Sequence, residues 1–264
     1  MKKGRRLLMS HYVDLNSDLG ESFGNYTLGM DSEVLNHVTS ANVACGWHAG
    51  DPLIMDATVH MCKEKGVAVG AHPGYPDLMG FGRRAMAVNP AEAKAYMIYQ
   101  VGALQAFCDS YGVTLQHMKL HGAFYNTACV TPALADAVLD GLQAVNPNIA
   151  AMVLSGSYIA KEAERRGIPV IQEVFADRGY TDEGTLVPRT EPGAFIKDPQ
   201  EALERVLMMV TEGKVVTNTG NTIDIVADSV CVHGDNPEAI AFTNYIREGL
   251  TKAGVTVANF QNRK

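Results

Sequence analysis

The chain has 264 residues, a formal net charge of −7 and a hydrophobic content of 47%. This length fits one large α/β domain or two small ones. The acidity argues against a nucleic-acid surface and against binding to anionic membranes. Five cysteines without a CxxC pair are typical of reduced thiols, so we expect a cytoplasmic protein without structural zinc.

The first ten residues, MKKGRRLLMS, combine a basic start with an apolar stretch of only Leu7 to Met9. A signal peptide has a longer apolar run and a small-residue cleavage site. No uninterrupted apolar run in the sequence is long enough to span a bilayer. We therefore expect a disordered leader over residues 1–10 and one folded domain over residues 11–264.

Short apolar runs alternate with longer amphipathic runs from residue 12 onward. The short runs predict seven strands, over residues 12–16, 40–45, 67–71, 115–121, 150–155, 169–176 and 229–233. A capping residue followed by proline predicts five helix starts, at Asp51-Pro52, Asn89-Pro90, Thr131-Pro132, Asp198-Pro199 and Asn236-Pro237.

The alternation of strands and helices predicts a parallel sheet. Because no linker rich in proline, glycine or serine divides the chain, a single seven-stranded β/α barrel fits better than two domains. An open, doubly wound sheet is the alternative. In both architectures the chemistry gathers at the carboxyl ends of the strands.

The first predicted strand carries polar residues along one side. In VDLNSDLGES, Val13 and Leu15 fall on one face, and Asp14, Asn16 and Asp18 fall on the other. Burial of unpaired carboxylates is strongly unfavourable. We therefore expect a polar barrel interior in which these groups meet a lysine, histidines or a cation. A turn or capping role for Asp18 is the alternative.

Four of the eight histidines lie where a predicted strand ends, with glycine one or two residues later. They are His48, His72, His121 and His233. Glycine allows a sharp turn and the close approach of a ligand. If the barrel is correct, these histidines converge on one mouth, which predicts a functional site there.

Two further strands contribute charged residues. His117, Lys119 and His121 share one face of their strand. Lys119 is suited to bind a carboxylate or phosphate, or to stabilise developing negative charge, and pairing with an aspartate of the first strand is compatible with either role. Glu173 interrupts an apolar strand and is either a ligand or proton-transfer group, or the ion-pair partner of Lys119 or a histidine.

Two long loops have the composition of functional segments. Residues 72–84 contain Tyr75 and Arg83, and residues 177–195 contain Arg178 and Arg189. Loops of this length often act as lids. Their arginines are suited to hold an anionic substrate through paired hydrogen bonds.

Six sequence blocks resemble the signature blocks of the LamB/YcsF family. These are VDLNSDLGESFG, SANVACGWHAGD, VGAHPGYPDLMGFGRR, KLHGAFYN, EVFADRGY and VCVHGDNP. The resemblance runs from Tyr12 to Phe260 and implies a seven-stranded β/α barrel similar to sugar-hydrolase and polysaccharide-deacetylase barrels. The family's KPHGALYN block has Leu120 and Phe124 here in place of proline and leucine.

The resemblance also implies a reaction. It is the ATP-dependent opening of the lactam 5-oxo-L-proline to L-glutamate by a multi-subunit 5-oxoprolinase, in which this chain acts with two partner subunits, B and C. ATP is then a co-substrate, and Mg²⁺ is expected with it. No GxxxxGK[ST] loop is present, so ATP binds at the barrel mouth or on a partner subunit. The alternatives are a metal-dependent amide or sugar deacetylase, and a non-catalytic substrate-binding subunit.

These observations define the predicted site. The predicted catalytic residues are Asp14, Asp18, His48, His72, Lys119 and His121. The predicted substrate- or nucleotide-binding residues are Asn16, Tyr75, Arg83, Asn126, Glu173, Asp177, Arg178, His233 and Asp235. If a metal ion is bound, the candidate ligands are Asp14, His48 and His72.

Overall fold

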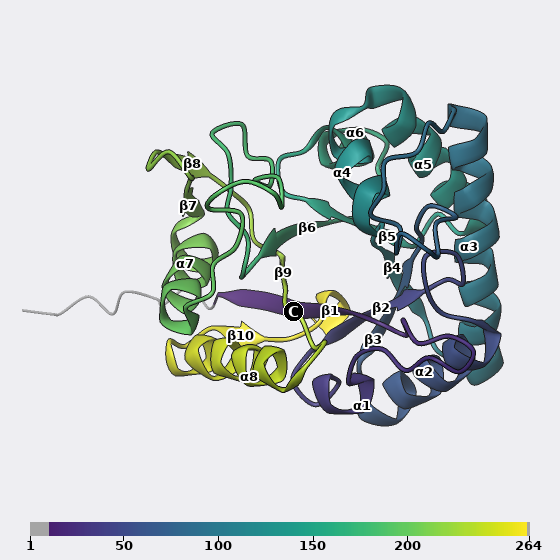
Figure 1. Cartoon of the computed structure of the whole chain (residues 1–264), viewed down its shortest axis with the longest axis horizontal. Coiled ribbons are helices and arrows are strands. Elements are labelled where there is room, and N and C mark those ends of the chain that lie inside the picture. Colours follow the sequence, from purple (N-terminus) through teal and green to yellow (C-terminus); the bar gives the residue numbers. More distant parts are fainter. Residues whose placement is uncertain (1–10, 263–264) are drawn as a thin grey trace, which may run out of the picture.

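Seven parallel strands form a closed barrel in the computed structural model, which describes residues 11–262 (Figure 1). The strands are β1 (Tyr12–Leu19), β2 (Ser40–Ala44), β3 (Ala68–His72), β4 (Leu115–Met118), β5 (Ala150–Leu154), β6 (Val170–Phe175) and β9 (Ser229–Cys231). β9 pairs with both β6 and β1, which closes the sheet. The predicted β/α barrel is confirmed, and the open-sheet alternative is wrong. The predicted leader of residues 1–10 lies outside the described residues.

Helices surround the barrel. Those of the described part are α1 (Asp31–Val34), α2 (Pro52–Lys65), α3 (Pro90–Tyr111), α4 (Gly122–Val130), α5 (Pro132–Val145), α6 (Tyr158–Arg165), α7 (Pro199–Glu212) and α8 (Pro237–Lys252). All five predicted proline starts are confirmed. Asp51, Asn89, Asp198 and Asn236 accept hydrogen bonds from the first turns of their helices, whereas Thr131 accepts none.

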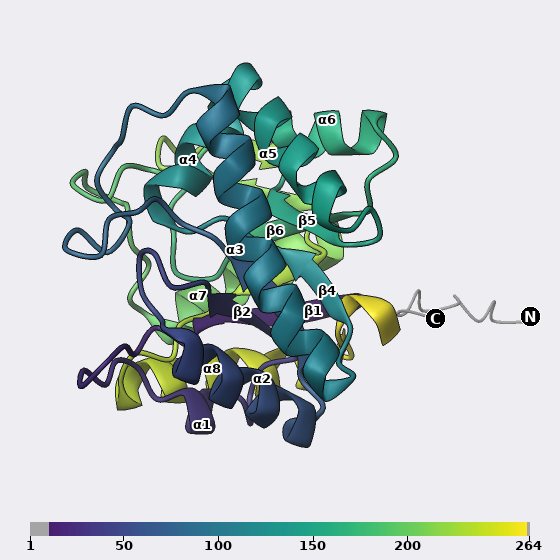
Figure 2. The same cartoon turned by 90° about the vertical axis from the view of Figure 1, so that its right-hand side faces the viewer.

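The apolar core lies between the strands and the helices. Val13 and Leu15 of β1 are fully buried. On the helix side, α3, which lies next to β4 in Figure 2, packs against β3 and β4. It buries Met97, Val101 and Leu104. Burial of this apolar surface is the main source of stability in such a barrel. Because the apolar side chains of the strands face the helices, the inner face of the strands is available to polar residues.

The barrel interior is polar, as the first strand predicted. The side chain of Asn16 donates to Ser229, and Asn42 donates to Asn16, both at 2.8 Å. His117 contacts Asn42 at 2.6 Å. Gly70 leaves room for this ring, because a Cβ atom at Gly70 would lie 2.1 Å from Nε2 of His117. The polar groups therefore satisfy one another across strands that are distant in sequence.

Three short strands lie outside the barrel and were not predicted. β7 (Lys214–Val216) pairs antiparallel with β8 (Thr222–Asp224), and β10 (Thr256–Val257) pairs with the start of β1. A short 3₁₀ helix, η1 (Phe260–Asn262), follows β10.

Within residues 11–262, no single helix has both the length and the apolar composition to cross a membrane. Helices α4 and α5 meet these two criteria only when they are taken as one segment, and they are bent by 115° relative to each other.

Candidate active site

A cavity of about 620 Å³ opens at the carboxyl ends of the strands. Nine of the predicted site residues line it, namely Asp18, His72, Arg83, Lys119, His121, Asn126, Arg178, His233 and Asp235. They come from segments along most of the chain. The residues that were predicted to share one mouth of the barrel therefore do lie around a common cavity.

Backbone turns bring the strand ends close to one another. Gly122 starts α4 with a positive φ of 54°, and a Cβ atom there would lie 2.6 Å from the carbonyl oxygen of Gly82. Only glycine tolerates this close approach without strain. The N–H of Ala123 donates to the same carbonyl at 2.9 Å. The loop that carries Arg83 is thus held directly above His121.

Lys119 is the centre of the charged network below the cavity. Its ammonium group lies 3.0 Å from Asp18 and 2.7 Å from Glu173. It also donates to Asn16 and to the sulfur of Cys231, each at 3.2 Å. Burial by itself lowers the pKa of Lys119, but the nearby Asp18, Cys231 and Glu173 outweigh it and raise that pKa well above its usual value. Lys119 is therefore a permanent cation.

Asp18 is the acidic group of this network that faces the cavity. Burial raises its pKa, but the interactions with His72 and Lys119 outweigh that effect and hold the pKa well below the usual value. Its Oδ2 atom lies 3.3 Å from Nε2 of His72, and Asn42 donates to Oδ1 at 2.9 Å. Asp18 is thus held as a carboxylate with one oxygen directed toward the histidines.

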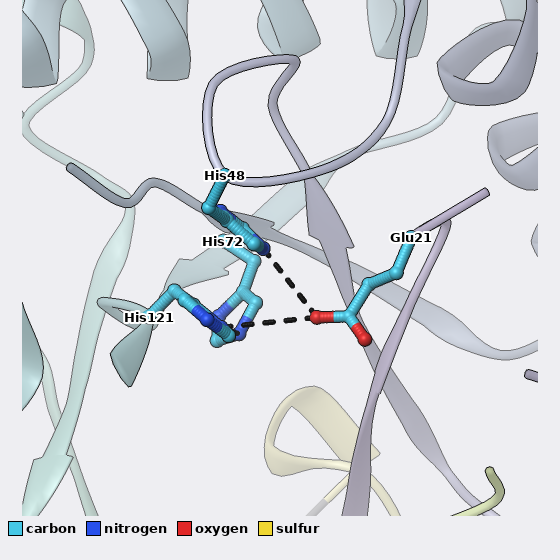
Figure 3. A group of neighbouring side chains, drawn as sticks. All are labelled: Glu21, His48, His72 and His121. Atoms are coloured by element: carbon cyan, nitrogen blue, oxygen red, sulfur yellow. Dashed lines mark hydrogen bonds and ion pairs between the residues drawn. The ribbon is translucent and has the colours of Figure 1, made fainter. Parts of the chain in front are cut away.

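Three of the four strand-end histidines form a cluster with Glu21. The rings of His48 and His121 stack in parallel with centroids 3.7 Å apart, and the ring of His72 meets both edge-on. Figure 3 shows the carboxylate of Glu21 pointing toward His48 and His121. Its Oε1 atom lies 3.4 Å from Nε2 of His48 and 3.7 Å from Nδ1 of His121.

Burial dominates the ionisation of this cluster. It lowers the pKa of His48 well below the usual value and the pKa of His121 to about 3, with neighbouring imidazoles adding to the effect. Burial and the charges of Asp18 and Asp235 raise the pKa of Glu21 well above the usual value. The rings of His48 and His121 are consequently neutral at physiological pH.

The fourth strand-end histidine stands apart from this cluster. His233 lines the cavity and lies 3.3 Å from the carboxylate of Asp177. The side chain of His233 is 30% exposed, unlike the three clustered histidines. Asp177 itself does not line the cavity, and it contacts His233 from behind the cavity wall.

Three arginines line the cavity and differ in what they contact. Arg178 is buried and donates to the backbone carbonyls of Ala194 at 3.0 Å and Val187 at 2.6 Å. It therefore holds the long loop in place. Arg83 lies over the ring of Phe81, and Arg189 lies over the ring of Phe195. Within the described part of the chain, neither of these two arginines forms an ion pair, which leaves both available to an anion.

Six predicted site residues do not line the cavity. They are Asp14, Asn16, His48, Tyr75, Glu173 and Asp177. Asp14 lies deep in the barrel, where the hydroxyls of Thr39, Ser40 and Ser229 donate to it. Tyr75 is fully buried and stacks on Phe124. Alternation along a strand predicts which face a side chain occupies but not how deep in the barrel it lies. Asp14 was therefore predicted at the mouth, which it does not reach.

Several cavity residues were missed by sequence reasoning. Glu21 follows the first strand directly and carries the carboxylate of the histidine cluster. Tyr125 lies on α4, lines the cavity and donates to Glu173 at 2.8 Å. Glu21 lies in the block VDLNSDLGESFG, two residues beyond the end of the first strand. This position could have identified it as a site residue. Tyr125 gave no such signal, because one tyrosine in an apolar helix normally indicates packing.

The predicted metal ligands do not come together as a set. His48 and His72 are neighbours, but Asp14 is not part of their cluster. Among residues 11–262, the group that could hold a metal ion consists of Glu21, His48, His72 and His121, whose potential ligand atoms all lie within 4.8 Å of one another. Imidazole and carboxylate donors suit first-row transition ions. The donor types therefore fit a metal ion, with Glu21 and His121 in place of Asp14.

A closed parallel barrel with a charged cavity at the carboxyl ends of its strands has the architecture of β/α-barrel enzymes. The profile of the LamB/YcsF family matches residues 13–264. The chain therefore belongs to the LamB/YcsF family, as the sequence blocks predicted.

Relatives with similar sequences share a name. The chain is 61% identical to the 5-oxoprolinase A subunit of Fusobacterium nucleatum, over 94% of this chain and 97% of the relative. It is 55% identical to the 5-oxoprolinase A subunit of Pyrococcus horikoshii, over 93% and 96%. The crystal structure of the lactam utilization protein from Thermus thermophilus is 45% identical, has a TM-score of 0.89, and covers 94% of this chain and 100% of that one.

Proposed function

We propose that this chain is the A subunit of a 5-oxoprolinase, which hydrolyses the lactam 5-oxo-L-proline to L-glutamate with the consumption of ATP. The observation that carries this proposal is the 61% identity to the 5-oxoprolinase A subunit of Fusobacterium nucleatum over almost the full length of both chains. The similarity to a lactam utilization protein supports the same class of substrate.

The cavity suits a small anionic lactam. At about 620 Å³ it has ample room for a five-membered ring. The guanidinium groups of Arg83 and Arg189 line it without a carboxylate partner in the described part of the chain. Burial and the nearby Arg83 lower the pKa of Arg189, which is the expected effect of a desolvated cation. A substrate carboxylate would relieve this repulsion.

ATP is needed because a lactam is a stable amide. Transfer of the γ-phosphoryl group to the amide oxygen releases ADP and makes the ring carbon electrophilic. Water then attacks this carbon, and a base accepts one proton of the water. The ring C–N bond breaks and the nitrogen takes up a proton, which leaves the phosphoryl group on the new carboxyl group as an acyl phosphate. A second water hydrolyses this acyl phosphate, so two waters are consumed and the products are glutamate, ADP and phosphate.

The cavity residues divide these tasks. Asp18 is the carboxylate of the first strand that reaches the cavity, and we assign to it the orientation and deprotonation of water. Lys119 lies beside it as a cation and stabilises the negative charge that develops on oxygen. We assign the substrate carboxylate to Arg83 and Arg189. Asn126, His233 and Asp235 complete the cavity wall.

The reaction is assigned to an assembly with two partner subunits, B and C. The relatives carry the name of one lettered component of an enzyme, which supports an assembly of several chains. ATP, with Mg²⁺, is a co-substrate of that assembly. We place the enzyme in the cytoplasm, and its five buried, free cysteines support a reducing compartment.

The test is a reconstitution. The chain is mixed with subunits B and C, 5-oxo-L-proline, ATP and Mg²⁺, and glutamate and ADP are measured, with each component omitted in turn. Equal amounts of glutamate and ADP, formed only in the complete mixture, are expected. Glutamate formed without ATP would favour a metal-dependent amide hydrolase. No glutamate in the complete mixture would overturn the proposal.

An Asp18→Asn variant tests whether this chain is catalytic. It should assemble with its partners, bind the lactam and lose most turnover. If turnover persists and only lactam binding weakens, the chain serves to bind substrate for its partners. Glu64→Gln, which alters an exposed carboxylate on α2, is the control and should keep full activity.

A further inference from the structure

Two buried imidazoles face one another through nitrogen atoms that both lack hydrogen when the two rings are neutral. Nδ1 of His72 lies 2.8 Å from the carbonyl oxygen of Lys119, and Nε2 of His121 lies 2.8 Å from the carbonyl oxygen of Phe81. A carbonyl oxygen only accepts, so each of these nitrogens carries its ring's hydrogen. In a neutral ring the other nitrogen then presents a lone pair.

The two lone-pair nitrogens lie only 2.9 Å apart, as Nε2 of His72 and Nδ1 of His121. Oε1 of Glu21 lies 3.7 Å from the second of them and makes no hydrogen bond within the described part of the chain. Oδ2 of Asp18 lies 3.3 Å from the first. Electron-rich atoms at these distances repel unless a cation lies among them. A positive species between the two rings, either a bound cation or a proton, would relieve this repulsion.

We propose that His72, His121 and Glu21 bind a divalent first-row transition-metal ion. Two imidazoles and one carboxylate form a known type of metal site that leaves positions open for water or substrate. Ligand bonds of about 2.1 Å place neighbouring ligand atoms about 3.0–3.4 Å apart. The separations of 2.9 Å and 3.7 Å lie within a few tenths of an ångström of this range. The third pair, His72 and Glu21, lies within 4.8 Å, so the Glu21 carboxylate has to move closer to His72. The backbone carbonyls on the opposite ring nitrogens are typical partners of metal-bound histidines.

Zn²⁺, Co²⁺ or Mn²⁺ fits this donor set better than Mg²⁺. Imidazole nitrogen suits the transition ions, whereas Mg²⁺ prefers oxygen ligands and keeps most of its water. The site is therefore distinct from any Mg²⁺ that accompanies ATP. It lies at the cavity, where Phe81 and His121 both form part of the wall.

His48 is assigned a positioning role. Its ring is nearly parallel to that of His121, at 3° and a centroid distance of 3.7 Å. An ion in the plane of His121 therefore lies outside the plane of His48, where the lone pairs of His48 do not point. Nε2 of His48 lies 3.4 Å from Oε1 of Glu21 and is placed to orient that carboxylate.

One proton shared by His72 and His121 is the competing explanation, since it would also relieve the repulsion. Metal titration separates the two explanations. The full-length chain, free of any polyhistidine tag, is treated with a chelator and titrated with Co²⁺ at neutral pH by absorption spectroscopy and calorimetry. We expect one equivalent of Co²⁺ per chain with visible d–d bands, and no displacement by excess Mg²⁺. Absence of stoichiometric binding overturns the proposal in favour of the shared proton.

Variants locate the bound ion. His72→Gln and His121→Gln should each weaken Co²⁺ binding by at least ~10-fold and change the d–d spectrum. His60→Gln is the matched control, because His60 is an exposed histidine paired with Glu64 at 3.4 Å on α2, and it should bind Co²⁺ like the parent chain. Unchanged affinity in both ligand variants overturns the assignment. If a ligand variant does not fold, Glu21→Gln is used, and it must show the same weakening.

Metal binding at this site does not depend on the proposed reaction. Metal content and Co²⁺ spectra are measured without lactam, ATP or partner subunits. A chain that binds Co²⁺ at this site but forms no glutamate would retain the metal site and lose the 5-oxoprolinase proposal. A chain that forms glutamate but binds no metal ion would retain the 5-oxoprolinase proposal and lose the metal site.

Discussion

The ammonium group of Lys119 lies 2.7 Å from the carboxylate of Glu173, and both side chains are almost completely shielded from solvent. Tyr125 donates to the second oxygen of Glu173 at 2.8 Å. The pair thus joins β6 to the segment after β4 inside the barrel. Because Lys119 also contacts Asp18, this buried pair supports the cation that faces the proposed substrate.

Removal of one partner of this pair should strongly destabilise the protein. Glu173→Ala leaves Lys119 buried with less compensation, and we expect a loss of about 3–5 kcal/mol in the free energy of unfolding. The control is Glu248→Ala on α8, which removes an exposed contact of 3.3 Å to Lys252 and should leave the free energy of unfolding nearly unchanged. Urea denaturation measures both. Equal losses would contradict the importance of the buried pair.

The cavity arginines should determine substrate affinity. Arg83→Ala or Arg189→Ala should raise the KM for 5-oxo-L-proline about 10- to 100-fold, since a hydrogen bond to a charged group contributes about 1.5–3 kcal/mol. kcat should change less. The measurement is glutamate formation by the reconstituted enzyme. Arg165→Ala, at a side chain 71% exposed on α6, is the control. An unchanged KM in both cavity variants would contradict the assigned role.

Two glycine substitutions should have opposite effects on stability. Gly70→Ala places a methyl group 2.1 Å from the buried ring of His117, and we expect a loss of about 1–3 kcal/mol or more from overpacking. Gly102→Ala on α3 meets no atom within 4 Å and should stabilise the helix by about 0.5–1 kcal/mol. Thermal unfolding measures both changes. A tolerated Gly70→Ala would show that His117 can move.

One surface cluster should make stability depend on pH in the acid range. Hydrogen bonds from Arg165 and Arg166 lower the pKa of Glu162 to about 2, below its ordinary value of 4.5. A lowered carboxylate pKa contributes stability above about pH 4.5, and this contribution is lost as the pH falls toward 2. The difference in unfolding free energy between the parent chain and Glu162→Gln should therefore shrink between pH 5 and pH 2. Urea denaturation across this range measures it; a constant difference would contradict the shift.

Much of the barrel could be predicted because its signals are local. Alternation along one strand places Asp14, Asn16 and Asp18 on a common face, and the same rule places Lys119 on the face of His117 in the predicted strand 115–121, although β4 itself ends at Met118. Strand ends in a parallel barrel share one rim, so the histidines followed by glycine could be assigned to a mouth. These predictions need only the strand positions and no knowledge of packing.

Depth and loop paths could not be predicted in this way. Asp14 and Asp18 are four residues apart, which is about 13 Å along a strand, so only one of them reaches the cavity. Glu21 depends on the turn at Gly20, whose φ of 69° directs the chain back toward the rim. The stacking of His48 on His121 depends on two loops that are distant in sequence. Such arrangements follow from tertiary packing rather than from any single segment.

The last barrel strand, β9, pairs with β1 and contributes Ser229, which donates to Asp14 and accepts from Asn16. A nascent chain leaving the ribosome therefore has an unclosed sheet until residue 231 has emerged. Until then, the carboxylate of Asp14 lacks one of its three hydroxyl donors, and the flanks of β1 and β6 are unpaired on one side. Synthesis at about 5–20 residues per second leaves this intermediate exposed for seconds. The order of translation thus makes the barrel's closure, and with it the active rim, one of the final events in the maturation of the polypeptide.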